Sequence, residues 1–124
     1  MEKLVVLVVE DEAIIRIEAV QMIKDAGYAA LDVPSTDDAI KILESRSDIR
    51  AVFTEIRVPG RLDGMHLARA IAERWPSVRL IATSSVPKID NFPADWRYIP
   101  KPYESGQIAA ALRALLAPRL RIVN

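Results

Sequence analysis

Five polar residues that could do chemistry follow apolar segments of this 124-residue chain. Glu10 and Asp11 come directly after one apolar run, and Glu55 ends a second run. Thr83 ends a third, and Lys101 follows a fourth. Carboxylate oxygens are the ligands that Mg²⁺ prefers, whereas a lysine and a hydroxyl can hold phosphoryl oxygens. Three carboxylates at close range also need a cation, because like charges raise one another's pKa. These residue types therefore predict a Mg²⁺ and phosphoryl site, provided that the fold brings them together.

The elements that must position these residues alternate between strand and helix patterns. Runs rich in β-branched residues predict strands, and apolar residues at helical spacing predict helices. The predicted strands cover Lys3–Val9, Ala29–Val33, Ala51–Glu55, Val78–Thr83 and Trp96–Ile99. The predicted helices cover Glu12–Ala26, Ser35–Ser45, Gly64–Trp75 and Glu104–Leu116. This alternation predicts an α/β fold, a doubly wound five-stranded parallel sheet whose strands all end at one edge.

One crossover lacks a helical signal. Residues 86–95 contain Pro87 and Pro93 and show no apolar residues at helical spacing. We therefore expect the fourth helix of a doubly wound fold to be shortened or absent here.

Composition narrows the class of protein. The chain contains 17 Lys plus Arg and 17 Asp plus Glu, so its formal net charge is zero, which argues against non-specific nucleic-acid binding. It has no cysteine, which excludes disulfides and thiolate metal sites. The N-terminal run "LVVLVV" is too short to span a membrane. We expect one cytoplasmic domain over residues 1–124, without direct nucleic-acid or membrane contact and with no DNA-binding output attached.

Four motifs in order resemble the receiver domain of two-component response regulators. The stretches are "VLVVEDE", "VFTEIRVPGRLDG", "LIATSS" and "YIPKPY", and their intervals cover nearly the whole chain. The loop and the last motif are most similar to those of stand-alone receivers. The resemblance implies a flavodoxin-like receiver fold with strand order 2-1-3-4-5, and phosphorelay signalling in which an aspartate becomes phosphorylated.

The resemblance also implies a metal site. Asp11 would bind Mg²⁺ directly and Glu10 through water, with Glu55 and the backbone carbonyl of Arg57 as further ligands. Glu55 stands at the position of the phosphoryl acceptor. Arg57 and Ser85 match positions that tune dephosphorylation.

Further roles follow from the same resemblance. Thr83 and Lys101 would bind phosphoryl oxygens, and a cis peptide would precede Pro102. Tyr98 matches the aromatic switch residue, whose rotamer changes together with Thr83 on phosphorylation.

The chain departs from the family pattern at the acceptor, where Glu55 replaces an aspartate. The interval from Thr83 to Lys101 is also a few residues shorter than usual. Glutamate carries its carboxylate about 1.5 Å farther from the backbone, and a misplacement of that size can cost roughly a hundredfold in rate. Glu55 is therefore expected to be a poor acceptor and to weaken the Mg²⁺ site, while reaching toward Thr83 and Lys101.

Three hypotheses remain open for Glu55. In the first, the domain signals by protein contact without needing phosphorylation, and Glu55 partly mimics the acyl phosphate. In the second, it is an active receiver that takes a phosphoryl group from a histidine kinase with Mg²⁺. In the third, it is an inert scaffold or dimerisation domain. None makes the chain an enzyme beyond its own phosphoryl transfer and dephosphorylation. The expected partners are a histidine kinase, a phosphotransfer protein or another signalling protein, and a homodimer through the last strand and helix is an alternative.

Each of these assignments has a plainer alternative. Glu10 and Asp11 could be a solvated helix start, since acidic residues favour that end of a helix. Lys101 could be a surface lysine, and Tyr98 an ordinary half-buried strand residue. His66 is the single histidine, and we assign it no part in the predicted site. The glycine motifs of dinucleotide-binding folds and of P-loop proteins are not present in the sequence.

Overall fold

The computed structural model describes residues 3–57, 64–85 and 96–116. The strands are β1 (Val5–Val9), β2 (Ala29–Val33), β3 (Ile49–Glu55), β4 (Arg79–Ser84) and β5 (Arg97–Pro100). The helices are α1 (Ala13–Asp25), α2 (Thr36–Ser45), α3 (Gly64–Arg74) and α4 (Ser105–Leu116). The expectation of a short or absent helix over residues 86–95 lies outside the described residues.

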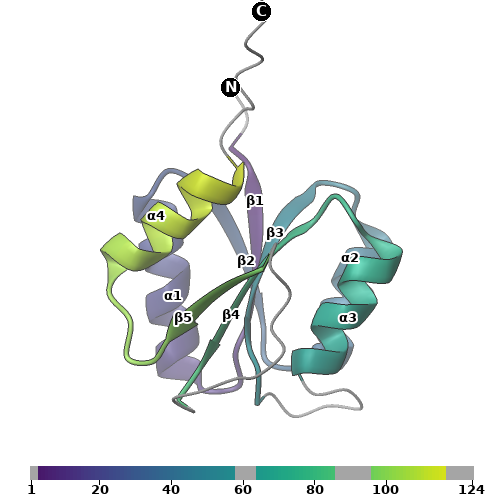
Figure 1. Ribbon diagram of the computed structural model, residues 1–124, viewed down its shortest axis with the longest axis horizontal. Coiled ribbons are helices and arrows are strands. Elements are labelled where there is room, and N and C mark those ends of the chain that lie inside the picture. Colours follow the sequence, from purple (N-terminus) through teal and green to yellow (C-terminus); the bar gives the residue numbers. More distant parts are fainter. Residues whose placement is uncertain (1–2, 58–63, 86–95, 117–124) are drawn as a thin grey trace, which may run out of the picture.

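The five strands form one parallel sheet in the order β2-β1-β3-β4-β5, as predicted. Figure 1 shows α1 and α4 over one face of this sheet and α2 and α3 over the other. The registers decide which residues become neighbours. Glu55, the last residue of β3, pairs with Thr83 of β4, so the acceptor position and the predicted phosphoryl-binding hydroxyl lie on adjacent strands.

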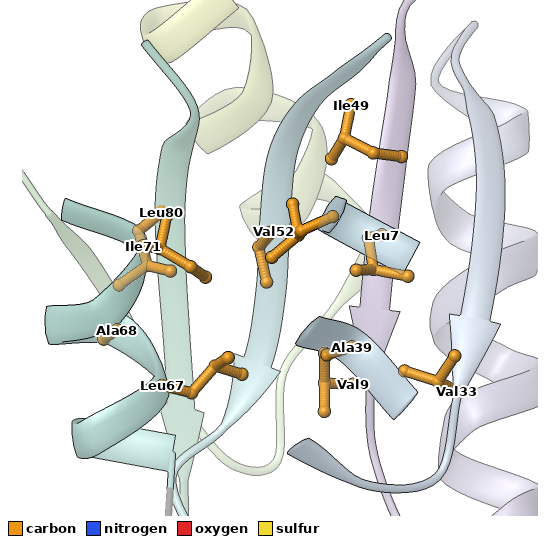
Figure 2. Packing of buried hydrophobic residues seen from close by; sticks show 11 residues of the cluster. Leu7, Val9, Val33, Ala39, Ile49, Val52, Leu67, Ala68, Ile71 and Leu80 are labelled. Carbon is orange, nitrogen blue, oxygen red and sulfur yellow. The ribbon is translucent and has the colours of Figure 1, made fainter. Parts of the chain in front are cut away.

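The core has two halves, one on each face of the sheet. β1 contributes to both, because successive residues of a strand point to opposite faces, and this explains its unbroken apolar sequence. On the face covered by α2 and α3, Leu67 and Ile71 of α3 lie against Val52 and Leu80 of the sheet (Figure 2). The other half is built from side chains of the sheet, α1 and α4, namely Val6, Val8, Ala19, Ile23, Ala51, Phe53, Ile81, Ile99, Ile108 and Leu112.

Two local signals mark the ends of helices. The Ser35 hydroxyl accepts a hydrogen bond from the backbone N–H of Asp38 at 3.2 Å, which caps α2. Gly27 follows α1 with φ +103°, a conformation that favours glycine.

Strand ends differ from the predictions by one or two residues. β3 begins at Ile49 rather than Ala51, because buried Ile49 joins the strand across the exposed Arg50. Within the described parts of the chain, no helix combines the length and hydropathy needed to cross a membrane.

Candidate functional site

The carboxyl ends of the strands bring three of the predicted residues into direct contact. Glu10 directly follows β1, Glu55 ends β3, and Lys101 directly follows β5. The Lys101 Nζ atom lies 2.7 Å from Glu10 Oε1 and 2.6 Å from Glu55 Oε2. We call this arrangement the Lys101 bridge. One ammonium group thus neutralises two carboxylates that come from neighbouring strands of the sheet.

The bridge is largely shielded from solvent. Glu10 is 3% exposed and Glu55 is 5% exposed, and 14% of the Lys101 side chain is exposed. A buried carboxylate loses its hydration and needs a partner, because the interior screens charge less well than water. The two contacts of Lys101 therefore compensate both carboxylates.

Backbone groups fix the second oxygen of each carboxylate. Glu10 Oε2 accepts a hydrogen bond from the Glu12 N–H at 3.2 Å. Glu55 Oε1 accepts one from the Arg57 N–H at 3.1 Å, while its Oε2 meets Lys101 as an ion pair and makes no hydrogen bond among the described residues. Each carboxylate is thus held between a backbone donor and the ammonium group, which fixes its orientation.

The bridge changes the protonation equilibria of the site. Burial disfavours the charged form of Lys101, but the carboxylates of Glu10 and Glu55 outweigh it and raise the lysine's pKa. Burial raises the pKa of Glu10 even though Lys101 and the Glu12 N–H stabilise its charge. Burial, with a smaller contribution from Glu10, raises the pKa of Tyr103 to about 12. The lysine therefore remains charged over the whole physiological pH range.

The predicted switch residues lie next to the bridge. Thr83 is 2% exposed, and its Oγ1 makes no hydrogen bond within the described segments. Tyr98 is half-buried, and its hydroxyl donates a hydrogen bond to the Ser84 carbonyl at 3.4 Å. Burial raises the pKa of Tyr98, and the charge of Glu55 adds to this. Glu55 and the two switch positions therefore share one environment, and the Thr83 hydroxyl remains able to bind a further group.

The peptide between Lys101 and Pro102 is cis, as the resemblance implied. The Lys101 N–H donates to the Ser84 carbonyl at 2.9 Å, so the backbone of the lysine is tied to the end of β4.

The residue types suit Mg²⁺, but their arrangement does not. A cleft of about 120 Å³ lies at this edge of the sheet, lined by Asp11, Glu12, Glu55, Arg57, Ser85 and Lys101. Asp11 is exposed, whereas Glu10 and Glu55 both contact the ammonium group. Among residues 3–57, 64–85 and 96–116, no three acidic or histidine side chains converge as a metal-binding group. Glu10 and Glu55 each direct one carboxylate oxygen to Lys101, and the metal roles of Glu10, Asp11, Glu55 and Arg57 remain predictions.

Gly64 supports the acceptor position, although sequence reasoning gave it no role beyond starting a helix. Its N–H donates to the Ile56 carbonyl at 2.7 Å. A Cβ atom at this position would lie closer than 3.0 Å to the Glu55 carbonyl oxygen and to Ile56 Cα. Only glycine therefore allows α3 to begin so close to the end of β3. The glycine at the end of "VPGRLDG" was the available signal.

Comparison with known proteins identifies the family. The model of the response regulator receiver domain matches residues 6–113. The chain belongs to the response regulator receiver domain family. It is thus a receiver domain of two-component signalling, and the resemblance seen in its four motifs is confirmed.

Two curated relatives are much longer than the segment that this chain matches. The chain is 28% identical over 117 residues to "Sensor kinase CckA" of Brucella abortus, covering 90% of the chain and 12% of the relative. It is 29% identical over 119 residues to "Putative response regulator NtrX-like" of Rickettsia felis, covering 91% of the chain and 25% of the relative. The chain therefore spans a quarter or less of the length of these two relatives.

A solved receiver has a similar fold over nearly its whole length. The crystal structure of a response regulator receiver protein from Sinorhizobium medicae superposes with a TM-score of 0.85 at 30% identity, covering 93% of this chain and 95% of that chain. Both chains therefore share the same arrangement of sheet and helices.

Proposed function

We propose that this receiver signals by protein contact without needing phosphorylation, because the Glu55 carboxylate already occupies Lys101. The observation that supports this most directly is the 2.6 Å contact between Glu55 Oε2 and Lys101 Nζ. In the family pattern, that lysine binds a phosphoryl oxygen on the acceptor. Here the longer glutamate side chain brings a negatively charged oxygen to the same cation.

The mimicry is partial. A phosphoryl group carries more negative charge than a carboxylate and offers three strong acceptor oxygens. Glu55 contacts Lys101, but the Thr83 hydroxyl makes no hydrogen bond within the described residues. Glu55 therefore reproduces one of the two expected contacts, and the second remains open.

The magnitude of one contact limits what Glu55 can do. A charge-assisted contact contributes about 1.5–3 kcal/mol before its desolvation cost, and a contact shifts an equilibrium only by its difference between the two states. Moving a population from 1:99 to 99:1 needs about 5.5 kcal/mol. Glu55 is therefore expected to shift the population toward the active-like state if the two states are nearly equal in free energy. It is not expected to make the active-like state dominant if the inactive state is strongly favoured.

The partners follow from the family. We expect a histidine kinase, a phosphotransfer protein or another signalling protein, in the cytoplasm, with a homodimer through β5 and α4 as an alternative. The exposed apolar surface beside the site supports a contact role. Ile14 is 72% exposed and Ile17 is 65% exposed, and both lie in the first half of α1, just after the acidic residues. The domain is not expected to act as an enzyme on other substrates.

Phosphoryl transfer provides the first test. The protein is incubated with Mg²⁺ and acetyl phosphate, and its intact mass is measured beside that of Glu55→Asp. We expect Glu55→Asp to gain the mass of one phosphoryl group while the unmodified protein gains none. A phosphorylated protein that loses its label in Glu55→Gln would instead support the active receiver, with Glu55 as acceptor.

Partner binding provides the second test and addresses the scaffold alternative. A candidate partner is measured against the unmodified protein, Glu55→Gln, and Glu55→Asp with and without acetyl phosphate. We expect the unmodified protein to bind more tightly than Glu55→Gln and than unphosphorylated Glu55→Asp. Equal affinity of the unmodified protein and Glu55→Gln would favour the inert scaffold.

A further inference from the structure

Arg16 joins three parts of the fold beside the Lys101 bridge. It lies in α1, and its side chain is 19% exposed. Its Nη1 donates a hydrogen bond to the Glu10 backbone carbonyl at 2.9 Å, and its Nε donates to Asp32 Oδ2 at 3.0 Å. Asp32 belongs to β2, one of the two edge strands of the sheet. One guanidinium group therefore connects the end of β1, the first half of α1 and the edge strand.

The Glu10 peptide is held on both sides. Its N–H donates to the Val33 carbonyl at 3.1 Å, and its carbonyl accepts from Arg16. The helix that follows has no side-chain cap, since Glu12 at its N-cap position makes no capping hydrogen bond. The backbone N–H of Arg16 donates to the Glu12 carbonyl at 2.9 Å, which is the ordinary first hydrogen bond of the helix. Arg16 thus fixes the connection between β1 and α1 through its side chain.

We propose that Arg16 is a positioning residue for the Lys101 bridge, with Asp32 as the partner that orients it. A guanidinium group donates from several N–H groups in one rigid plane, so it can bind a carbonyl and a carboxylate together. A lysine ammonium at the end of a flexible stem does not provide this fork. By fixing the Glu10 carbonyl, Arg16 fixes where the Glu10 carboxylate meets Lys101.

The consequence is a physical connection between the edge strand and the signalling site. Asp32 has a side chain that is 42% exposed, so this end of the connection reaches the surface. Loss of the Arg16 or the Asp32 side chain should leave the Glu10 carboxylate less well aligned with Lys101. Glu55 should keep its contact with Lys101, because the Arg57 N–H holds its carboxylate independently. This inference rests on the proposed function only in taking the bridge to be the functional element.

NMR spectroscopy of the Lys101 ammonium group tests the proposal. The exchange rate of the Nζ protons with water and the ¹³C shift of the Glu10 carboxylate are compared in the unmodified protein, Arg16→Met and Asp32→Asn. We expect several-fold faster exchange and a moved Glu10 signal in Arg16→Met, and a smaller change of the same sign in Asp32→Asn. Arg16→Lys should give values between those of Arg16→Met and the unmodified protein, because lysine keeps the charge but lacks the forked guanidinium group.

A matched control removes an ion pair on another part of the surface. Arg74 donates to Glu44 at 2.8 Å in an exposed pair between α3 and α2, so Arg74→Met removes a comparable charge and contact. It should leave both Lys101 and Glu10 signals unchanged.

The results separate this inference from the proposed function. Unchanged Lys101 and Glu10 signals in folded Arg16→Met and Asp32→Asn would overturn the positioning role. If Arg16→Lys gave the same Lys101 exchange rate and Glu10 shift as the unmodified protein, the requirement for a guanidinium group would be overturned. If Arg16→Met does not fold, the same signals are compared in Asp32→Asn and Arg16→Lys. Unchanged Lys101 and Glu10 signals in both of these variants would overturn the positioning role. A failure of the proposed function would appear instead in the Glu55→Gln comparison, whatever Arg16 does.

Discussion

Replacing Lys101 with methionine should strongly lower the free energy of unfolding, because it removes the cation from the Lys101 bridge. Methionine keeps an apolar side chain of similar length but removes the charge. Glu10 and Glu55, which are 3% and 5% exposed in the unmodified protein, would then lack a cation. Removing one partner of a buried ion pair costs about 3–5 kcal/mol. For a domain whose total stability is about 5–15 kcal/mol, the variant should fold but be much less stable.

Proton uptake should limit this loss at low pH. Burial already raises the pKa of Glu10, and without Lys101 to stabilise its charge this pKa should rise further. The folded variant then binds more protons than the unfolded chain, whose glutamates titrate at about 4.3. Its stability should consequently be highest near that pH and fall as the pH rises above it.

Urea unfolding followed by tryptophan fluorescence measures both effects. Lys101→Met is compared with the unmodified protein and with Lys41→Met, which removes an exposed lysine of α2. The measurements are made with a chelator and with Mg²⁺, because a cation that binds only the folded state stabilises it by about 2.7 kcal/mol at 100 times its dissociation constant. We expect Mg²⁺ to stabilise Lys101→Met much more than the unmodified protein.

The double variant Lys101→Met/Glu55→Gln provides an internal check. It contains one buried charge fewer, so it should be more stable above neutral pH than Lys101→Met alone. The reasoning would be refuted if Lys101→Met were as stable as Lys41→Met with the chelator at every pH, because the bridge would then contribute nothing to folding.

Three further predictions concern the surroundings of the bridge. Gly64→Ala should lose about 1–3 kcal/mol of stability, because its Cβ meets the backbone after β3, whereas Gly106→Ala, whose Cβ meets nothing within 4 Å, should be neutral or stabilising by thermal unfolding. Tyr103 should form tyrosinate only near pH 12 in absorbance titrations. Since its folded pKa exceeds the ordinary 10.0, stability should fall as the pH rises between these values, and Tyr103→Phe should lack that part of the loss. Calorimetry should show tighter Mg²⁺ binding to Glu55→Asp than to the unmodified protein, and equal or weaker binding would contradict the competition with Lys101.

The sheet could be predicted because its signals are local. The Val-rich β1, the glycine after α1 and the serine before α2 each act through neighbouring residues. Strand order then followed from the resemblance to receivers, and the carboxyl ends of parallel strands must share an edge. The meeting of Glu10, Glu55 and Lys101 was therefore predictable from three separate segments.

The pairing within the site was only partly accessible from sequence. The reach of Glu55 toward Lys101 was expected from the longer glutamate side chain and is confirmed, whereas the second contact of Lys101, with Glu10, was not expected. That second contact depends on side-chain reach, and sequence spacing does not fix it. Arg16 was missed for a similar reason. Its partners, the Glu10 carbonyl and Asp32, are a backbone atom and a residue 16 positions away, and neither forms a recognisable motif.

The central claim is that the Glu55 carboxylate shifts this receiver toward its active-like state without phosphorylation. NMR signals of the Tyr98 ring and the Thr83 methyl group test it most directly. They are recorded for the unmodified protein, Glu55→Gln, and Glu55→Asp with and without acetyl phosphate and Mg²⁺. The unmodified protein should lie between the two states of Glu55→Asp, and Glu55→Gln should coincide with the unphosphorylated state. If the signals of the unmodified protein coincide with those of Glu55→Gln and of unphosphorylated Glu55→Asp, the carboxylate does not act as a mimic.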